Sequence, residues 1–199
     1  MPAFSPGPVL EPRYAAALGD DDPVFVMAQT PDRVRRLIRG LTERQLETRP
    51  APGKWCIKEI VAHLADSEVI LGSRYRFVGA HDRPALPSTD QDAFVERLGP
   101  MNAKAADLAD DFAMARAVNL GLFERLPGEA WDRVGLHAER GEESIRYMVA
   151  MYAGHDRIHL AQIETIRTGL FPRAGKNRAK RKSKPRPSKT SRKRTAKRR

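Results

Sequence analysis

The sequence has one cysteine and lacks long hydrophobic runs. A single thiol, Cys56, excludes an intramolecular disulfide and a zinc site built from several thiolates. Nowhere do about eighteen apolar residues follow one another, so we expect no membrane-spanning helix. Residues 1–12 lack the basic start and the apolar centre of a secretory signal. These absences predict a protein of the reducing cytoplasm, and 199 residues suffice to bury a core without cross-links.

Acidic residues are missing from the end of the chain. Residues 173–199 contain 15 Lys and Arg and no Asp or Glu, whereas residues 1–172 contain 21 basic and 25 acidic side chains. We therefore expect a mildly acidic folded part and a disordered basic C-terminal tail. Such a tail is either a solubilising segment or a tether that binds nucleic acid or another polyanion non-specifically. Aromatic residues are absent from it, which argues against base stacking and sequence-specific reading.

The rest of the chain predicts an all-α domain. Residues 1–22 are rich in proline and are expected to form a flexible leader before a domain over residues 23–172. Apolar residues then recur at helical spacing in four long segments, which gives a four-helix bundle. The sequence Thr30-Pro31-Asp32 resembles a helix start, and Glu142-Glu143-Ser144 resembles another. The predicted helices cover about 30–41, 55–79, 103–126 and 145–167, with a shorter helical piece at 92–98.

Two histidines four residues apart lie in the last predicted helix. Positions i and i+4 of an α-helix face the same side, so His155 and His159 can converge on one metal ion. A third candidate, His63, lies in the second long helix, flanked by apolar residues. Three histidines on two helices of a bundle would form a metal site with an open position. A hydrogen-bonded structural histidine is the alternative for each of them taken alone.

Acidic residues lie one turn from His63 on either side. Glu59 and Asp66 share its helical stripe, so either one is a candidate partner for an imidazole nitrogen or a candidate base. Trp55 is expected to anchor the core. Asp156 and Arg157, between the two histidines of the pair, are expected to point away from a metal and to form surface or dimer contacts.

Two motifs carry a resemblance to a known family. The string W-x3-E-x3-H-L-x-D-x-E from Trp55 to Glu68, followed by G-H-D-R-x-H-L-x-Q-I from Gly154 to Ile163, resembles the DinB/YfiT-like superfamily. The approach to the first motif, over residues 46–55, is similar as well. The resemblance covers about residues 24–171 and implies an up-down-down-up four-helix bundle that often forms homodimers. It also implies metal ligation by His63, His155 and His159, with Gln162 as a supporting or packing residue.

The resemblance also bears on chemistry. Three neutral imidazoles leave a coordination position open, as in catalytic metal sites. Zinc is the default ion for such ligands, and nickel, iron or manganese would also fit. Members of the family with known activity resemble thiol-dependent transferases and isomerases. We therefore expect an enzyme that activates a low-molecular-weight thiol or water for transfer or hydrolysis on a small electrophilic substrate.

Two other interpretations remain open at this point. In the first, the bundle is a non-catalytic scaffold that associates with nucleic acid through residues 173–199. In the second, the histidines bind adventitious metal without turnover.

Overall fold

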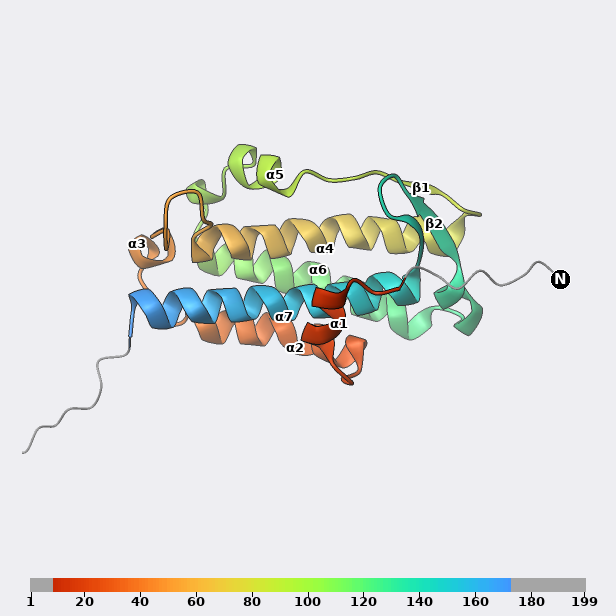
Figure 1. Ribbon diagram of the computed structural model, residues 1–199, viewed down its shortest axis with the longest axis horizontal. Helices are drawn as coiled ribbons and strands as arrows, with labels where there is room; N and C mark the ends of the chain where they lie inside the picture. The colour runs from red at the N-terminus through yellow and green to blue at the C-terminus, as the bar shows by residue number, and fades with distance from the viewer. Residues whose placement is uncertain (1–8, 173–199) are drawn as a thin grey trace, which may run out of the picture.

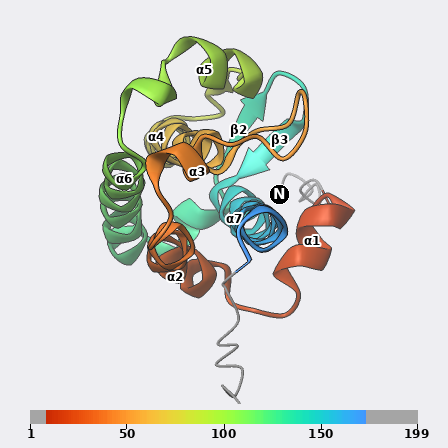
Figure 2. The same cartoon turned by 90° about the vertical axis from the view of Figure 1, so that its left-hand side faces the viewer.

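Four long helices run side by side in the computed structural model, which describes residues 9–172 (Figure 1). Viewed end-on, α6 and α7 lie at opposite corners of the bundle, as do α2 and α4 (Figure 2). Among residues 9–172, no helix is long and apolar enough to cross a bilayer. The bounds of the four helices are α2 Pro23–Ile38, α4 Ile57–Ala80, α6 Ala105–Arg125 and α7 Ile145–Leu170.

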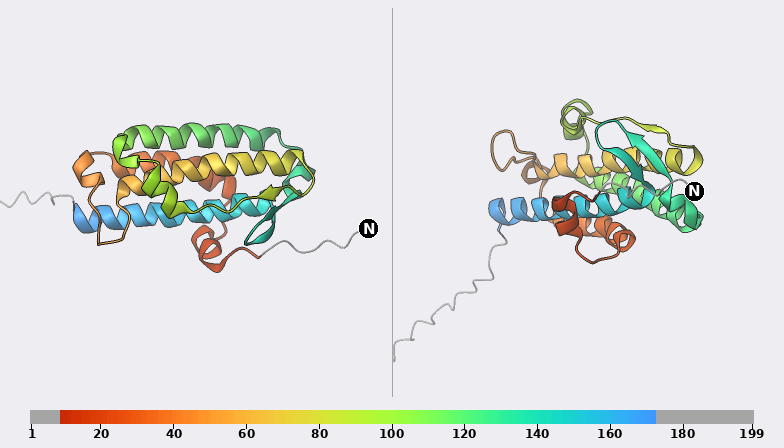
Figure 3. Two further views of the ribbon diagram at one scale, coloured as in Figure 1. Left: turned by 90° about the horizontal axis from the view of Figure 1, so that it is seen from above. Right: turned by 45° about the vertical axis from the view of Figure 1, so that its right-hand side comes forward.

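The bundle has the predicted up-down-down-up topology. α2 and α7 run in one direction, and α4 and α6 both run in the other (Figures 1 and 3). Because α4 and α6 are parallel, the chain must return along the whole bundle between them. This return holds β1 (Ala85–Leu86), α5 (Gln91–Arg97) and the short 3-10 helix η1 (Pro100–Asn102), and it passes over the outer face of α4. A short helix, α3 (Glu43–Leu46), joins α2 to α4.

The first long helix begins earlier than the sequence pattern suggested. It starts at Pro23, where the Asp22 side chain accepts the Phe25 N–H at 2.8 Å, and Pro31 lies inside it. The predicted start at Thr30 is therefore wrong, and the Thr30 hydroxyl instead donates to the Val26 carbonyl. Proline has no N–H, so Pro31 leaves the Met27 carbonyl without its helical donor. Another helix supplies that donor, as described below.

A small sheet, absent from the prediction, closes one end of the bundle. The parallel strands β1 and β2 (Val134–His137) pair with each other, and β2 pairs antiparallel with β3 (Gly141–Ser144). The connection before β2 contains a second 3-10 helix, η2 (Gly128–Asp132). Figure 3 shows the sheet beside the ends of α4 and α7.

The sheet changes the expected start of α7. Glu142 and Glu143 belong to β3, and Ser144 alone caps α7, by accepting the Tyr147 N–H at 3.0 Å. The expectation that these acids open the helix is therefore wrong. Strands this short carry too little alternating pattern to be recognised in a sequence.

Part of the expected flexible leader is a helix. α1 (Pro12–Leu18) packs against α7, and its Leu18 side chain is buried. The prediction of a loosely ordered leader is thus incorrect for these residues, because tertiary contacts stabilise a helix too short to persist alone. Residues 1–8 and the predicted disordered tail, residues 173–199, lie outside the described residues.

The apolar core is divided into two parts. One cluster fills the end of the bundle near α3, and the other fills the end near the sheet. Between them, the middle of α4, α6 and α7 contributes buried polar side chains: His63, Glu68, Arg116, Asn119, His155 and Asp156. We call these six residues the polar layer, and the candidate site lies at one side of it.

Candidate metal centre

Three histidines converge between the antiparallel helices α4 and α7. The Nε2 atom of His155 lies 3.0 Å from Nε2 of His63 and 3.1 Å from Nε2 of His159. One ligand nitrogen from each ring lies within 4.8 Å of the other two. His63 and His155 are buried, and His159 is half-buried. The structure therefore brings together the three residues that the sequence indicated.

The spacing of these nitrogens suits one metal ion. Two nitrogen ligands of a tetrahedral zinc, each about 2.0–2.1 Å from the ion, are roughly 3.3 Å apart. The observed separations of 3.0 and 3.1 Å are close to this value. Three imidazoles supply three of the four ligands of such an ion, which leaves one position for a further ligand. The donor set thus fits a divalent ion with an open position.

Burial keeps these imidazoles in the form that binds metals. Desolvation, followed by the charge of His159, lowers the pKa of His63 to about 3. Desolvation also lowers the pKa of His155 and His159, and for His155 the neighbouring histidines contribute further. Neutral imidazoles offer a nitrogen lone pair without first losing a proton.

Gln162 orients one of the rings. Its Oε1 atom lies 3.0 Å from Nδ1 of His159, so the amide oxygen can accept the Nδ1 proton and leave the Nε2 lone pair free for a metal. Gln162 lies three residues after His159, on the same face of α7. This agrees with the supporting position that the family resemblance implied for it.

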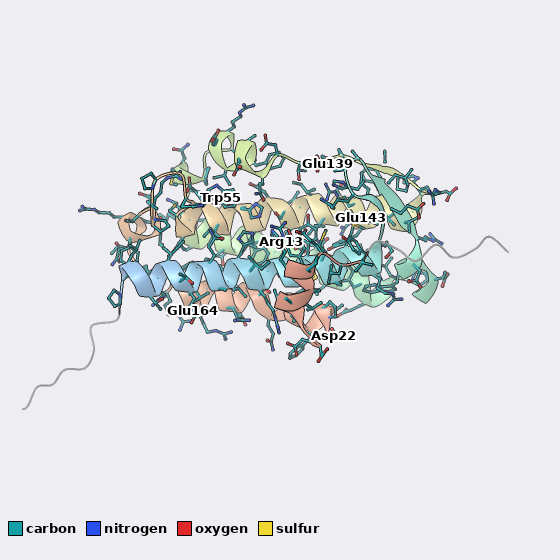
Figure 4. All side chains as sticks on the ribbon, viewed as in Figure 1. Arg13, Asp22, Trp55, Glu139, Glu143 and Glu164 are labelled. Atoms are coloured by element: carbon teal, nitrogen blue, oxygen red, sulfur yellow. The ribbon has the colours of Figure 1, made fainter. Side chains whose placement is uncertain are left out.

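Replacing Gln162 by alanine should weaken zinc binding about 10- to 100-fold, the usual cost of losing an outer-shell partner of a ligand. Competition with a chromophoric chelator measures the affinity. The exposed Glu164, on the same helix (Figure 4), provides a matched control as Glu164→Ala. Equal zinc affinity in the two variants would show that the contact between Gln162 and His159 does not orient the ligand.

Trp55 packs against the histidines as well as against the core. Its ring centroid lies 5.0 Å from that of His63 and 6.4 Å from that of His159, and its plane is nearly parallel to the latter ring. It also contacts the apolar cluster near α3, so the expected core role is only part of its position. This indole therefore packs on one side of the histidine cluster.

Glu59 caps the N-terminal end of α4. One of its oxygens accepts the Cys56 N–H at 2.8 Å, and the other pairs with Arg49, whose guanidinium also donates to the Lys54 carbonyl at 2.9 Å. Both carboxylate oxygens are thereby engaged in fixing the loop before Trp55. This geometry does not favour Glu59 as an imidazole partner or a base, because one oxygen caps the helix and the other is paired with Arg49.

A cavity of about 330 Å³ adjoins the histidine cluster, and His63 and His155 line it. Asp66 lines the same cavity, and desolvation raises the pKa of its carboxyl group. Of the two acids singled out in the sequence, Asp66 is therefore the one that faces this space. Further walls come from α1, from the segment around α5 and from the turn between β2 and β3: Arg13, Tyr14, Phe94, Glu139 and Arg140.

Of the two residues expected at the surface, Asp156 is buried, whereas Arg157 forms a surface ion pair with the exposed Asp21. Asp156 is buried, and its carboxylate pairs with Arg116 at 2.8 Å. Arg157 donates to the carbonyls of Ala17 and Leu18 at 3.2 and 3.0 Å, at the end of α1. The expectation was wrong for Asp156 because a helix inside a bundle has neighbours on several sides, so a residue that points away from the metal can still meet protein.

Gly154, the first residue of the second motif, permits a close approach between helices. A Cβ atom at this position would collide with the backbone carbonyl of Tyr14 in α1. Because a backbone carbonyl cannot move aside as a flexible side chain can, glycine allows α1 to lie directly on α7. The motif thus combines two metal-ligand candidates with residues that seat α1 and hold the core.

The centre of the polar layer is an ion network that sequence reasoning did not find. Arg116 pairs with Glu68 and with Asp156, each at 2.8 Å, and Asn119 donates to the Glu68 carboxylate at 2.8 Å. Arg116 also donates to the Met27 carbonyl at 2.7 Å, which is the carbonyl that Pro31 leaves free. The neighbouring carboxylates raise the pKa of Arg116 despite its burial. The sequence offered two signals for this network. Pro31 lies inside an amphipathic segment, and Arg116 is a charged residue in an otherwise apolar stripe.

Known proteins are similar to this chain over most of its length. A relative from Bacillus mycoides, named "Putative metal-dependent hydrolase", is 27% identical over 143 residues, or 70% of this chain and 80% of the relative. "Putative metal-dependent hydrolase YfiT" of Bacillus subtilis is 24% identical over 147 residues, or 72% of this chain and 81% of the relative.

A solved structure shows the same fold. It is described as "YfiT from Bacillus subtilis is a probable metal-dependent hydrolase with an unusual four-helix bundle topology". It superposes with a TM-score of 0.71 at 18% sequence identity and covers 84% of this chain and 93% of its own.

The sequence profile of the DinB superfamily matches residues 27–163, which include all three histidines of the cluster. The fold, the converging histidines and this match agree with one another. The chain belongs to the DinB superfamily.

Proposed function

We propose that this protein is a metal-dependent enzyme that performs hydrolysis or group transfer on a small electrophilic substrate. The observation that supports this most directly is the convergence of three neutral Nε2 atoms beside a cavity that two of the same histidines line. The relatives named as metal-dependent hydrolases support the same class of reaction.

In this proposal, His63, His155 and His159 hold the ion, and Gln162 orients His159. Zinc is the first candidate, and nickel, iron and manganese also accept imidazole ligands. When bound, such an ion lowers the pKa of a water or thiol in its open position toward neutrality. A low-molecular-weight thiol cosubstrate is therefore one version of the reaction, and hydrolysis by water is the other.

The protein's own side chains contribute the remaining functions. Asp66 lines the cavity and has a raised pKa, which suits a group that accepts a proton from the nucleophile at its carboxylate oxygen. Trp55 packs between the cluster and the apolar core near α3 and so supports the rings of the ligands. The ion network in the polar layer joins α7 and α4 to α6, because Arg116 pairs with Asp156 and Glu68.

Metal content tests the proposal. The untagged protein should contain about one divalent ion per chain by inductively coupled plasma mass spectrometry, and a His63→Ala/His159→Ala double variant should contain none. Hydrolase and thiol-transfer assays on the loaded protein would then follow. Absence of stoichiometric metal in the wild type, even after reconstitution with zinc, would refute the proposed site.

A second proposal concerns residues 173–199, whose 15 cations without an acid favour polyanion binding. We infer that this segment binds nucleic acid non-specifically, either beside the enzymatic activity or, if the bundle is only a scaffold, in place of it. Deleting it should abolish binding to duplex DNA at low salt and leave metal content unchanged. DNA affinity that survives the deletion would refute the proposal.

We also propose a cytoplasmic location and a homodimer. The first rests on the single cysteine, which is buried, and the second on the family resemblance. Sedimentation of the protein at micromolar concentration would distinguish a dimer from a monomer.

A further inference from the structure

Helix α1 is seated firmly enough to form part of the cavity wall. Gly154 lets its backbone contact α7 directly, and Arg157 binds the carbonyls at its C-terminal end. A cation at this end also interacts favourably with the partial negative charge of the helix terminus. Leu18 is buried in the apolar cluster near the sheet. These three contacts fix α1 over the middle of α7, where His155 lies (Figure 1).

The fixed helix places a cation beside the histidines. The Tyr14 ring centroid lies 6.2 Å from that of His155, and the Arg13 guanidinium lies over the Tyr14 ring, 4.5 Å from its centroid. Arg13 is therefore within about 11 Å of the His155 ring, and both residues line the same cavity. Figure 4 labels Arg13 on α1, which packs against α7.

Neighbouring groups hold the Arg13 side chain in this position. Its Nη2 donates to the Tyr14 hydroxyl at 2.8 Å, and its Nε pairs with Glu11 at 2.8 Å. These contacts place the guanidinium over one face of the tyrosine ring. Arg140 also lines the cavity and pairs with Glu143.

We propose that Arg13 attracts and stabilises an anionic group at the open position of the metal, so that the site favours ligands that are negatively charged or become so as they react. This inference rests on the proposed function, because it requires an ion at the three histidines. Fixed charges aimed at developing negative charge commonly give the largest electrostatic contribution to catalysis. Arg13 supplies this charge from α1, which lies outside residues 27–163, the part of the chain that matches the family.

The size of the effect follows from Coulomb's law. A unit charge about 10 Å away, at an effective dielectric constant of roughly 20 to 80, changes the affinity for an anion about two- to fifteen-fold. Because Arg13 is largely exposed, salt should reduce the effect.

Azide binding to the cobalt-loaded full-length chain tests this inference. Co²⁺ reports ligand binding through its visible absorption, so the azide dissociation constant can be measured at low ionic strength without a substrate. Arg13→Gln should weaken azide binding about five-fold, and Arg13→Lys, which keeps the charge, should remain within about two-fold of the wild type. Arg33→Gln, on the exposed side of α2 and outside the cavity, is the matched control and should bind azide as the wild type does.

The outcomes separate this inference from the function on which it rests. A normal cobalt spectrum with equal azide affinity in Arg13→Gln and Arg33→Gln would overturn the inference alone. Equal weakening by Arg13→Gln and Arg13→Lys would also overturn it, because the effect would then come from packing and not from charge. Failure of the wild type to bind cobalt would refute the metal site and this inference together.

Discussion

Replacing Arg116 by methionine should lower the free energy of unfolding by about 3–5 kcal/mol, the usual cost of removing one partner from a buried ion pair. Arg116 is 1% exposed and is the cation paired with both Glu68 and Asp156, which are themselves buried. Without it, two carboxylates remain in the core, and the Met27 carbonyl beside Pro31 loses its donor. Denaturant unfolding monitored by circular dichroism measures the change.

Two further variants distinguish the charge imbalance from a simple loss of volume. Arg125→Met, at an exposed position of the same helix, should change stability by less than about 0.5 kcal/mol. Replacing all three charged residues, as Arg116→Met/Glu68→Leu/Asp156→Leu, should restore much of the loss, since apolar replacement of a whole buried network is often neutral. A triple variant no more stable than Arg116→Met would show that packing, not unpaired charge, is responsible.

Zinc should stabilise the folded protein strongly. A ligand that binds only the native state at 1,000 times its dissociation constant adds about 4 kcal/mol. For a domain of this size, that corresponds to a rise in Tm of roughly 8–16 °C. The rise should be absent from His63→Ala, because His63 is the ligand that joins α4 to the histidine pair on α7. Scanning calorimetry with and without zinc measures both proteins.

The control is a histidine outside the cluster. His81 caps the C-terminal end of α4 and is exposed, so His81→Ala should keep the full zinc-dependent rise in Tm. If His63→Ala and the wild type were stabilised equally, zinc would be bound elsewhere in the chain, and the three-histidine site would be refuted.

The long helices and the three histidines could be predicted from the sequence because their signals are local. Helical periodicity recurs over several turns, and the spacing of His155 and His159 places them on one face whatever the helix packs against. The fold class and the family followed from these patterns and from two motifs in the right order. The position of His63 relative to the pair, in contrast, depends on how two helices pack, so the sequence alone offered His63 only as a candidate and the resemblance implied the full set.

The tertiary structure decided which neighbours the other polar residues have. Pro31 reads as a helix start when residues 30–32 are taken alone, but Arg116 of a distant helix binds the carbonyl that it frees, and so the proline can lie inside α2. Asp156 resembles a surface residue until α6 brings Arg116 against it.

The same holds for the wall of the cavity. α1 is too short to predict as a stable helix, and Arg13 acquires a place beside the histidines only through the contact at Gly154. Helical periodicity indicates which face of a segment is buried, and local spacing indicates which residues share that face. Neither pattern indicates which distant group pairs with a buried charge, because this pairing depends on how elements far apart in the chain pack together.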